Sequence, residues 1–313
     1  MRILVTGAAG FIGSNIAVEL ASNGHDVVGA DTFLSGAFAN LVDFTGDVLT
    51  LRTHDDLESI AKAGPFDAIV HQAAITGVVG AGGENFSDQH RMMLNNAEMF
   101  RGLLDHAVAT RARVVWASSC SIYGRGPVPM VESQPADPLN IYAFSKLTCE
   151  RLARRYAARL KHPVVGLRYT NVYGPREHHK GKLASMIQQL ATQMRAGKQP
   201  RVFTGGEQRR DFVYIADVVA ANTLALELAA PGAHVFNVGA GESYSFNQLI
   251  AELNRALGTD LPPDYFPNPY SFTQDNTLAD LTQSRKVLGY QPAYPLAKGV
   301  DAYLASGRLG VGG

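Results

Sequence analysis

The fold of this chain is decided near its beginning by the stretch Thr6-Gly7-Ala8-Ala9-Gly10-Phe11-Ile12-Gly13. The apolar run Ile3–Val5 leads into it, and apolar residues then recur at helical spacing through Phe11–Asn23. This pattern predicts a buried strand, a tight turn and a helix. A second strand is expected at Val27–Ala30, so the chain begins with the first part of a parallel β-sheet.

Strand and helix patterns keep alternating after this unit. Further buried strands are predicted at Ala68–His71, Val114–Ala117 and Val164–Tyr169, and helices at Met92–Ala109 and Tyr142–Leu160. Such alternation predicts an α/β fold with a doubly wound parallel sheet, the Rossmann fold.

The character of the chain changes after Gly174-Pro175. Several prolines between residues 262 and 269 suit the interior of a sheet poorly, whereas Phe212–Val219 and His234–Val238 return to the pattern of the large lobe. We therefore expect a smaller lobe that is discontinuous in sequence. The predicted division assigns 1–174 plus 209–240 to the large domain and 175–208 plus 241–313 to the smaller lobe.

Composition and charge exclude several classes of protein. Hydrophobic residues make up 46% of the 313 residues, charged residues 18%, and the formal net charge is +0. No global field therefore draws the chain to nucleic acid or to an anionic membrane, and no apolar run predicts a membrane span. The two cysteines, Cys120 and Cys149, lack metal-ligand spacing and suit a reducing compartment. Since the N-terminus has no signal-peptide pattern, we expect a cytoplasmic protein without a metal site.

The three glycines of the opening stretch suit a dinucleotide. Gly7 permits the sharp turn, Gly10 lets a pyrophosphate approach the backbone, and Gly13 lets the helix pack on the strand. The helix N-terminus presents free N–H groups to the phosphates. Asp31 follows 18 residues after Gly13 and can accept hydrogen bonds from a ribose diol. Because Thr32–Asn40 holds no basic residue to balance a 2′-phosphate, we expect NAD rather than NADP.

A second acidic position is less specific. Asp47 and Val48 follow the next short element, where an aspartate can bind the amino group of adenine. A solvated turn aspartate is the alternative interpretation.

The sequence also contains a set of residues suited to proton abstraction. Tyr142 and Lys146 are four residues apart, on one face of a predicted helix. A tyrosine is a poor base at neutral pH, but a nearby ammonium and a positively charged nicotinamide favour its phenolate. Ser119, at the end of a predicted strand, can hold a substrate hydroxyl beside that tyrosine. We expect these three side chains to face a hydride acceptor.

Together these motifs resemble the extended short-chain dehydrogenase/reductase superfamily over nearly the whole chain. The matching segments are Thr6–Gly13, His71–Ala74, Ser118–Gly124, Tyr142–Lys146, Arg168–Pro175 and Arg210–Val218. The resemblance implies an NAD-dependent epimerase of nucleotide-sugars whose smaller lobe binds substrate. Cofactor contacts are then implied for Gly7, Gly10, Phe11, Ile12, Gly13, Asp31, Gln72, Ala73, Ala74, Asn96, Tyr142 and Lys146.

The same resemblance assigns the pyrophosphate of the substrate to Asn171 and Arg210. A guanidinium offers phosphate oxygens a fork of donors, which supports this role for Arg210. The alternative for Arg210 is a salt bridge to Asp211 or another acid.

Within the superfamily the chain resembles the ADP-L-glycero-D-manno-heptose 6-epimerases. Their hallmark, Y-G-P-R-E-x-H-K-G-x-x-A-S, is matched by Tyr173–Ser185, and Tyr270–Gln274 is a further similarity. The resemblance implies that Tyr142 and Lys180 serve the two faces of the sugar, one removing a proton when hydride leaves and the other supplying one when hydride returns. A phosphate-binding or solvated lysine is the alternative for Lys180.

One segment departs from the heptose epimerase pattern. Those enzymes carry a Ser/Thr-rich segment in the sugar pocket, whereas Ile75–Glu84 is apolar and rich in glycine. Thr76 and Tyr270 are still expected to contact substrate, together with Ser119 and Lys180. The sugar, the nucleotide base and the epimerised carbon stay open.

Three alternatives remain beside this reading. The chain could be a 4-epimerase of another nucleotide-sugar, a nucleotide-sugar dehydrogenase or reductase with net redox change, or a non-catalytic dinucleotide sensor. Retention of Ser119, Tyr142 and Lys146 argues against the sensor. We expect a homo-oligomer, because relatives commonly dimerise through the helices that match Met92–Ala109 and Tyr142–Leu160.

Overall fold

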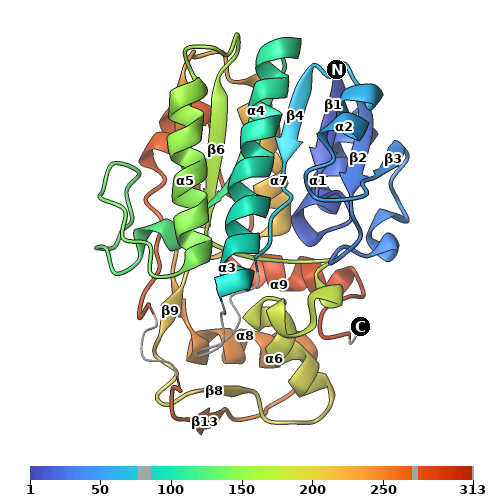
Figure 1. The fold of residues 1–313 in the computed structure, drawn as a ribbon. Coiled ribbons are helices and arrows are strands. Elements are labelled where there is room, and N and C mark those ends of the chain that lie inside the picture. Colours follow the sequence, from blue (N-terminus) through green and yellow to red (C-terminus); the bar gives the residue numbers. More distant parts are fainter. Residues whose placement is uncertain (77–85, 270–273, 312–313) are drawn as a thin grey trace.

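The structure, a computed structural model, describes residues 1–76, 86–269 and 274–311 and is organised around one parallel sheet (Figure 1). Its seven strands have the order β11-β6-β5-β4-β1-β2-β3, and every neighbouring pair is parallel. The strands are β1 (Arg2–Thr6), β2 (Asp26–Asp31), β3 (Asp47–Thr50), β4 (Ala68–His71), β5 (Arg113–Ser119), β6 (Val164–Tyr169) and β11 (Ala233–Val238). The predicted doubly wound fold is confirmed, with the order reversing between β1 and β4.

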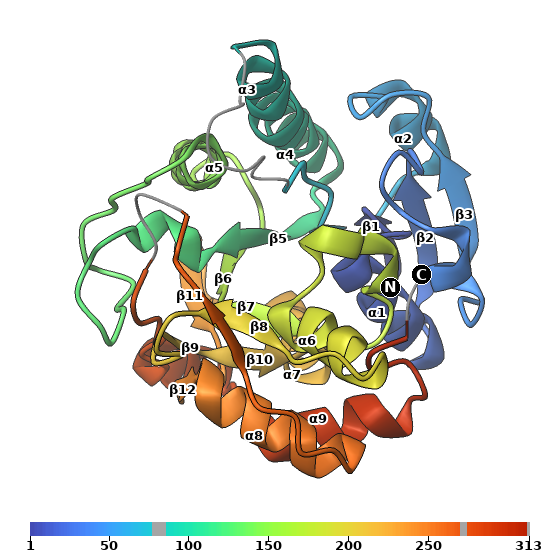
Figure 2. The ribbon, with the colours of Figure 1, turned by 90° about the horizontal axis from the view of Figure 1, so that it is seen from below.

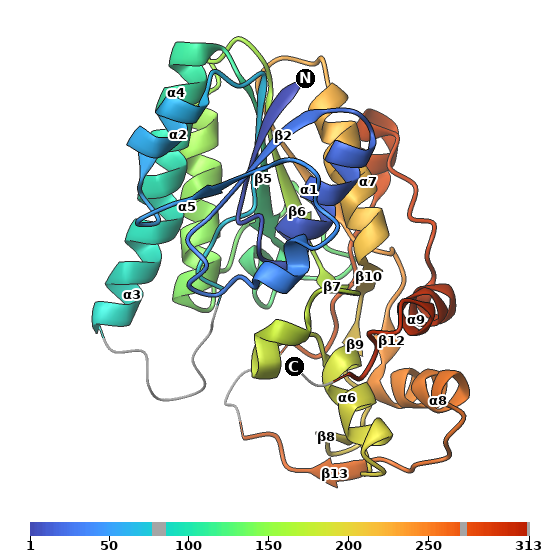
Figure 3. The same cartoon turned by 90° about the vertical axis from the view of Figure 1, so that its right-hand side faces the viewer.

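Helices cover both faces of this sheet (Figure 3). One face carries α2 (Leu57–Ala63), α4 (Met99–Thr110) and α5 (Ile141–Tyr156), and the other carries α1 (Phe11–Ser22) and α7 (Ile215–Glu227). The alternation of side chains along β1 explains the two layers. Leu4 is buried against the α4 and α5 side, while Ile3 and Val5 are buried against α1 and α7.

The remaining elements lie below the carboxyl ends of the strands. Helices α6 (Met186–Arg195), α8 (Phe246–Leu257) and α9 (Leu296–Ala305) are accompanied by the pair β8 (Arg201–Phe203) and β13 (Asp264–Phe266). Seen from below, α3 (Phe86–Met93), α4 and α5 lie on one side of β5 and α7, α8 and α9 on the other (Figure 2).

Two short strand pairs join these parts. Strand β7 (Asn171–Tyr173) pairs with β10 (Phe212–Tyr214), and β9 (Arg209–Arg210) pairs with β12 (Tyr244–Ser245). The segments expected to return to the large lobe become β10 with the start of α7, and β11. The domain boundaries given above stay a prediction.

The helix predicted at Met92–Ala109 is interrupted. A π-helical turn, Leu94–Glu98, separates α3 from α4 and places Asn96 inside the protein. Such turns often occur at functional sites. No described helix is long and apolar enough to cross a membrane.

A buried ion pair lies between β6 and α5, beneath the strand end that carries Ser119. The guanidinium of Arg168 donates two hydrogen bonds to Glu150, at 2.8 and 2.7 Å, and Ser118 Oγ donates a third at 2.8 Å. The side chain of Glu150 is fully buried and that of Arg168 nearly so. A buried charge without its partner costs far more than an exposed one.

We therefore expect Glu150→Gln to lower the free energy of unfolding by about 3 kcal/mol, because Arg168 keeps its charge in an apolar surrounding. Urea unfolding followed by circular dichroism measures the change. Arg101→Ala, which breaks the exposed pairs of Arg101 with Glu98 and Asp105, is the matched control and should cost much less. Equal losses in the two variants would contradict the expectation.

Candidate active site

The candidate site lies where the strand order reverses, at the carboxyl ends of β1 and β4. In open parallel sheets, ligands bind in the crevice at such a point. The glycine turn after β1, Asp31 at the end of β2, His71–Ala74 after β4 and Ser119 at the end of β5 all lie along this edge.

The glycine turn leaves no room for side chains. Gly7 has a φ of +69°, and a Cβ there would lie 2.7 Å from the backbone nitrogen of Ala73. A Cβ at Gly13 would lie 2.1 Å from the carbonyl oxygen of Gly7. Gly10 is the N-cap of α1 and offers no side chain to its N–H groups. The turn therefore fits a pyrophosphate, which those N–H groups can bind.

Asp31 lies beside the glycine turn, at the carboxyl end of β2. Its carboxylate accepts hydrogen bonds from the N–H groups of Ala9, at 2.9 Å, and Phe33, at 2.8 Å. Ala9 belongs to the glycine turn, so the acid is fixed against the predicted pyrophosphate site. This position suits an acceptor for a ribose diol.

The structure corrects the expectation for Asp47 and Val48. They begin β3 rather than following a strand, and they pair with Val28 and Gly29 in the middle of β2. Thr50, at the carboxyl end of β3, is the residue that pairs with Asp31. Asp47 and Val48 are therefore exposed at the amino end of β3 and do not lie at the strand ends that carry Asp31.

Gln72 and Asn96 both form side-chain hydrogen bonds beside the site. Gln72 Nε2 donates to Asn222 Oδ1 at 3.2 Å. Asn96 Oδ1 accepts from the N–H of Ile75 at 2.8 Å, and its Nδ2 donates to Ser145 Oγ at 3.0 Å. The amide of Asn96 thus ties the segment after β4 to helix α5.

The neighbouring alanines are placed by their backbone. Ala73 packs against the glycine turn through the contact with Gly7 described above, and its N–H donates to Thr6 Oγ1 at 3.4 Å. Ala74 follows it along the same edge and is partly buried. Their small side chains suit a site where backbone segments meet closely.

The structure brings Tyr142, Lys146 and Ser119 together. Lys146 Nζ lies 5.8 Å from the centroid of the Tyr142 ring and donates to the carbonyl oxygen of Ala117 at 2.7 Å. Burial raises the pKa of Tyr142 to about 12, and a hydrogen bond with Ser119 acts in the opposite direction. Burial also lowers the pKa of Lys146. We expected Lys146 to lower the pKa of Tyr142. Within the protein chain alone, burial has the larger effect, and the pKa of Tyr142 is raised.

Lys180 approaches the glycine turn from another segment. It belongs to the turn η4 (His178–Leu183), and its Nζ lies 5.5 Å from the centroid of the Phe11 ring, at the start of α1. Burial lowers the pKa of Lys180, and the charge of Glu177 raises it. The neighbouring rings of His178 and His179 are perpendicular, and no described group of His, Cys, Asp or Glu has the arrangement of a metal site.

The predicted substrate residues lie on the segments that join the two lobes. Asn171 Nδ2 donates to the carbonyl oxygen of Asp211 at 3.1 Å and to Thr277 Oγ1 at 3.2 Å. Arg210 is largely buried and makes no ion pair within the described residues, so the predicted alternative of a salt bridge to Asp211 is not found. Instead, its Nη1 donates to the carbonyl oxygen of Arg209 at 2.8 Å. Asp275 is close enough for its charge to oppose the lowering of the Arg210 pKa by burial, but among the described residues most donors of the guanidinium have no hydrogen-bond partner and can serve an anion.

Two further substrate predictions lie at or beyond the edge of the described residues. Thr76 is exposed and is the last residue before the segment 77–85. Tyr270 and residues 77–84 lie outside the described residues.

Thr277 and Glu177 hold residues of the candidate site, and neither was predicted from the sequence to do so. Thr277 Oγ1 accepts hydrogen bonds from both Asn171 and the N–H of Asp211. No motif surrounds Thr277, so no signal in the sequence marked it. Glu177 lies inside the quoted Tyr173–Ser185 motif, where its position three residues before Lys180 was the signal.

Comparison with known proteins agrees with this geometry. Residues 3–239 match the NAD-dependent epimerase/dehydratase family. The chain belongs to that family. ADP-L-glycero-D-manno-heptose-6-epimerase from Helicobacter pylori is 37% identical in sequence, with a TM-score of 0.89 over 97% of this chain and 95% of that one.

Two other solved structures show the range of the family. UDP-glucose 4-epimerase from Thermotoga maritima, solved with UDP-glucose, is 29% identical with a TM-score of 0.89 and covers 98% of this chain and 99% of its own. UDP-glucuronic acid 4-epimerase from Bacillus cereus, solved with UDP-glucuronic acid and NAD, is 29% identical with a TM-score of 0.84, covering 97% and 98%. The family recognised from the sequence and its cofactor, NAD, are confirmed.

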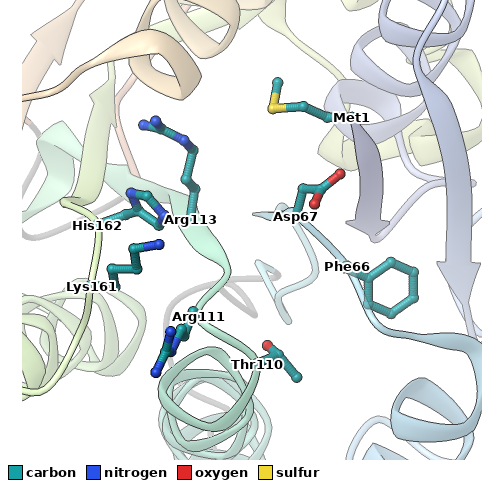
Figure 4. Close-up of a pocket in the computed structure, with 8 residues that line it drawn as sticks. All are labelled: Met1, Phe66, Asp67, Thr110, Arg111, Arg113, Lys161 and His162. Carbon is teal, nitrogen blue, oxygen red and sulfur yellow. The ribbon is translucent and has the colours of Figure 1, made fainter.

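A second hollow lies at the opposite edge of the sheet of this epimerase-family chain (Figure 4). It has a volume of about 600 Å³ and is lined by the basic side chains Arg111, Arg113, Lys161 and His162. Arg111 is the C-cap of α4, where a positive charge complements the helix dipole. This hollow therefore lies away from the crevice that holds the predicted catalytic residues.

The basic residues near Asp31 are already engaged. Leu51 donates its N–H to the carbonyl oxygen of Asp31 at 2.9 Å, which brings the following Arg52 close to this end of β2. Arg52, however, donates two hydrogen bonds to Asp56, each 3.0 Å long. Neither Arg52 nor the segment Thr32–Asn40 thus offers a free cation to a 2′-phosphate, which favours NAD.

We expect Asp31→Asn to reduce the preference for NAD over NADP by about tenfold, because it removes the negative charge that opposes a 2′-phosphate. Calorimetric titration of each cofactor measures the two dissociation constants. Asp47→Asn, at the start of β3, is the control and should leave their ratio unchanged. An unchanged ratio in Asp31→Asn would contradict the assignment of the ribose site.

Proposed function

We propose that this protein is a nucleotide-sugar epimerase and that its substrate is an ADP-glyceromanno-heptose, epimerised at C6. The position of Lys180 supports this proposal best. Its ammonium lies beside the ring of Phe11 at the glycine turn, and it comes from a different segment of the chain than Tyr142. The likeness to the Helicobacter pylori heptose 6-epimerase supports the same choice.

The proposed chemistry uses proton transfer at two places. NAD, when bound, accepts a hydride from a secondary carbinol and returns it. Ser119 holds the reacting hydroxyl and Tyr142 removes its proton, which leaves a keto-sugar. Ser119 lies close enough to Tyr142 to lower the pKa of that phenol, which supports this pairing. Since the same hydride leaves and returns, no external redox partner is needed.

Lys180 is proposed as the acid and base for the second face of the sugar. If the ketone oxygen moves away from Tyr142 when the other face of the carbon turns toward the hydride, a second group must supply its proton. Burial lowers the pKa of Lys180, which makes its ammonium a better proton donor than an exposed lysine. Phosphate binding by Lys180 is the competing role.

Asn171 and Arg210 are proposed to hold the pyrophosphate of the substrate. Arg210 has a largely buried guanidinium without an ion pair among the described residues, and anions bind strongly to such groups. Thr76 and Tyr270 are proposed to contact the sugar. Homo-oligomerisation and a cytoplasmic location remain predictions from the sequence.

A 4-epimerase of another nucleotide-sugar is the second candidate. The glycine-rich segment Ile75–Glu84 departs from the heptose epimerase pattern, and two of the similar structures are UDP-sugar 4-epimerases. A sugar with fewer hydroxyl groups, or a different reacting carbon, would suit an apolar segment better.

Incubation of the protein with ADP-D-glycero-D-manno-heptose should invert C6 without added reductant, and NMR of the sugar follows the change. The total amounts of NAD and NADH should stay constant, which separates an epimerase from a dehydrogenase. Inversion of UDP-glucose at C4 instead, with no change in the heptose, would establish the second candidate.

Tyr142→Phe and Lys180→Ala should each lower kcat at least about 100-fold with little change in KM, because each removes one proton-transfer group. Steady-state kinetics on the inverted substrate measure both constants. Lys182→Ala changes an exposed lysine of the same turn and should retain normal kcat. If Lys180→Ala behaves like Lys182→Ala, Lys180 is not the second acid and base.

A further inference from the structure

Lys180 belongs to a short turn that needs support from elsewhere in the chain. Gly181, the next residue, has a φ of +53°, in the left-handed region that favours glycine. The turn is a 3₁₀ helix of six residues that is interrupted at Gly181, so it has too few hydrogen bonds of its own to fix its side chains. The position of the ammonium must therefore be set by contacts at the two ends of the turn.

One carboxylate joins those two ends. Glu177 Oε1 accepts from the N–H of Gly174 at 3.1 Å and from Ser185 Oγ at 2.8 Å, while Oε2 accepts from the N–H of Ser185 at 2.5 Å. Ser185 is also the N-cap of α6, where its Oγ accepts from the N–H of Gln188. Glu177 thereby fixes the segment between the end of β7 and the start of α6. Its own carbonyl oxygen accepts from the N–H of Lys180 at 3.0 Å.

The outer side of the same segment contacts α1 and the residues around the glycine turn. Asn15 Nδ2 donates to the carbonyl oxygen of Pro175 at 3.1 Å, and Arg176 forms an ion pair with Asp43 at 2.7 Å. Asn40 Nδ2 lies 3.1 Å from His179 Nδ1 and donates to the carbonyl oxygen of Ala9 at 2.9 Å. Glu177 thus holds the inner side of a turn whose outer side already contacts α1 and the segment between β2 and β3.

We infer that Glu177 is the positioning residue for Lys180: its buried carboxylate joins the two ends of the turn and thereby holds the ammonium beside Phe11 at the glycine turn. The inference rests on the proposed function for the catalytic role of Lys180. Glu177 contacts no reacting atom, so its action is through Lys180 alone.

The electrostatics agree with this arrangement. The side chain of Glu177 is fully buried, and burial raises its pKa, while the hydrogen bonds from Ser185 and Gly174 and the charge of Lys180 lower it. Other charged or titratable groups near this turn are Arg176, His178, His179 and Lys182 on its own segment, Asp31 and Asp43 near the glycine turn, and Tyr303 of α9, whose phenol interacts with Glu177. Glu177 is the group whose charge opposes the effect of burial on Lys180.

The test compares Glu177→Gln with Asp217→Asn. Asp217 is a buried carboxylate that likewise accepts two backbone N–H groups, from Ala293 and Tyr294, but holds no residue of the candidate site. Both variants should lose stability, measured as Tm. Only Glu177→Gln should lower the apparent pKa of Lys180, by about one unit or more, because an opposite charge nearby shifts a pKa by that amount.

Two readouts follow Lys180. The first, which needs no substrate, is the rate at which acetic anhydride modifies Lys180 at a series of pH values, measured by peptide mass spectrometry. The second is the pH dependence of kcat for epimerisation, in which Glu177→Gln should lose at least tenfold in kcat with little change in KM. A wild-type modification midpoint and kcat in folded Glu177→Gln would overturn the inference.

Ser185→Ala covers the case in which Glu177→Gln does not fold. It keeps the carboxylate and removes one donor to it, so kcat should fall several-fold while the modification midpoint of Lys180 stays within a few tenths of a unit. An unchanged kcat in Ser185→Ala would count against positioning. If Lys180→Ala retains activity, the proposed catalytic role fails, while the modification midpoint still shows whether Glu177 sets the proton affinity of Lys180.

Discussion

The rest of the site depends on how closely three backbone segments meet at the glycine turn. The end of β4 lies against Gly7 at Ala73, and the first turn of α1 lies against the carbonyl oxygen of Gly7 at Gly13, both too close for a Cβ. Such contacts fix the distance between the helix N-terminus and the strand ends. Because Asp31 also bonds to this turn through Ala9, the cofactor crevice is built from backbone that has little freedom to move.

Buried carboxylates organise the loops around that rigid centre. Asp211 accepts from the N–H groups of Ala240 and Ala279, which joins the segment after β11 to the strand that carries Arg210. Glu177 does the same for the segment of Lys180. A loop cannot bury its backbone N–H groups without acceptors, and one carboxylate supplies several. Irregular segments with few apolar contacts can thereby carry side chains at defined positions.

The sequence predicted the sheet well because its strands are buried on both faces. The bounds of Ala68–His71 and Val164–Tyr169 agree fully, since continuous apolar runs mark such strands. It placed Asp47 wrongly because β3 is an edge strand without an apolar run to show where it begins. Two features could not be predicted from local sequence pattern, because they depend on packing between distant segments. They are the π-helical turn at Asn96 and the contact of Thr277 with Asn171.

Burial acts on Tyr142 and Lys180 in a way that bears on reversible chemistry. It raises the pKa of the phenol and lowers that of the amine, so each group is shifted toward its neutral form. In their neutral forms the phenol of Tyr142 is a proton donor and the amine of Lys180 is a proton acceptor. In their ionised forms they would place two charges among buried side chains, where charge is poorly hydrated. Glu177 on one side and the charge of a bound nicotinamide on the other oppose these shifts. Under the proposed function each group would be the donor in one direction and the acceptor in the other, and such opposing effects on the two pKa values would suit that exchange.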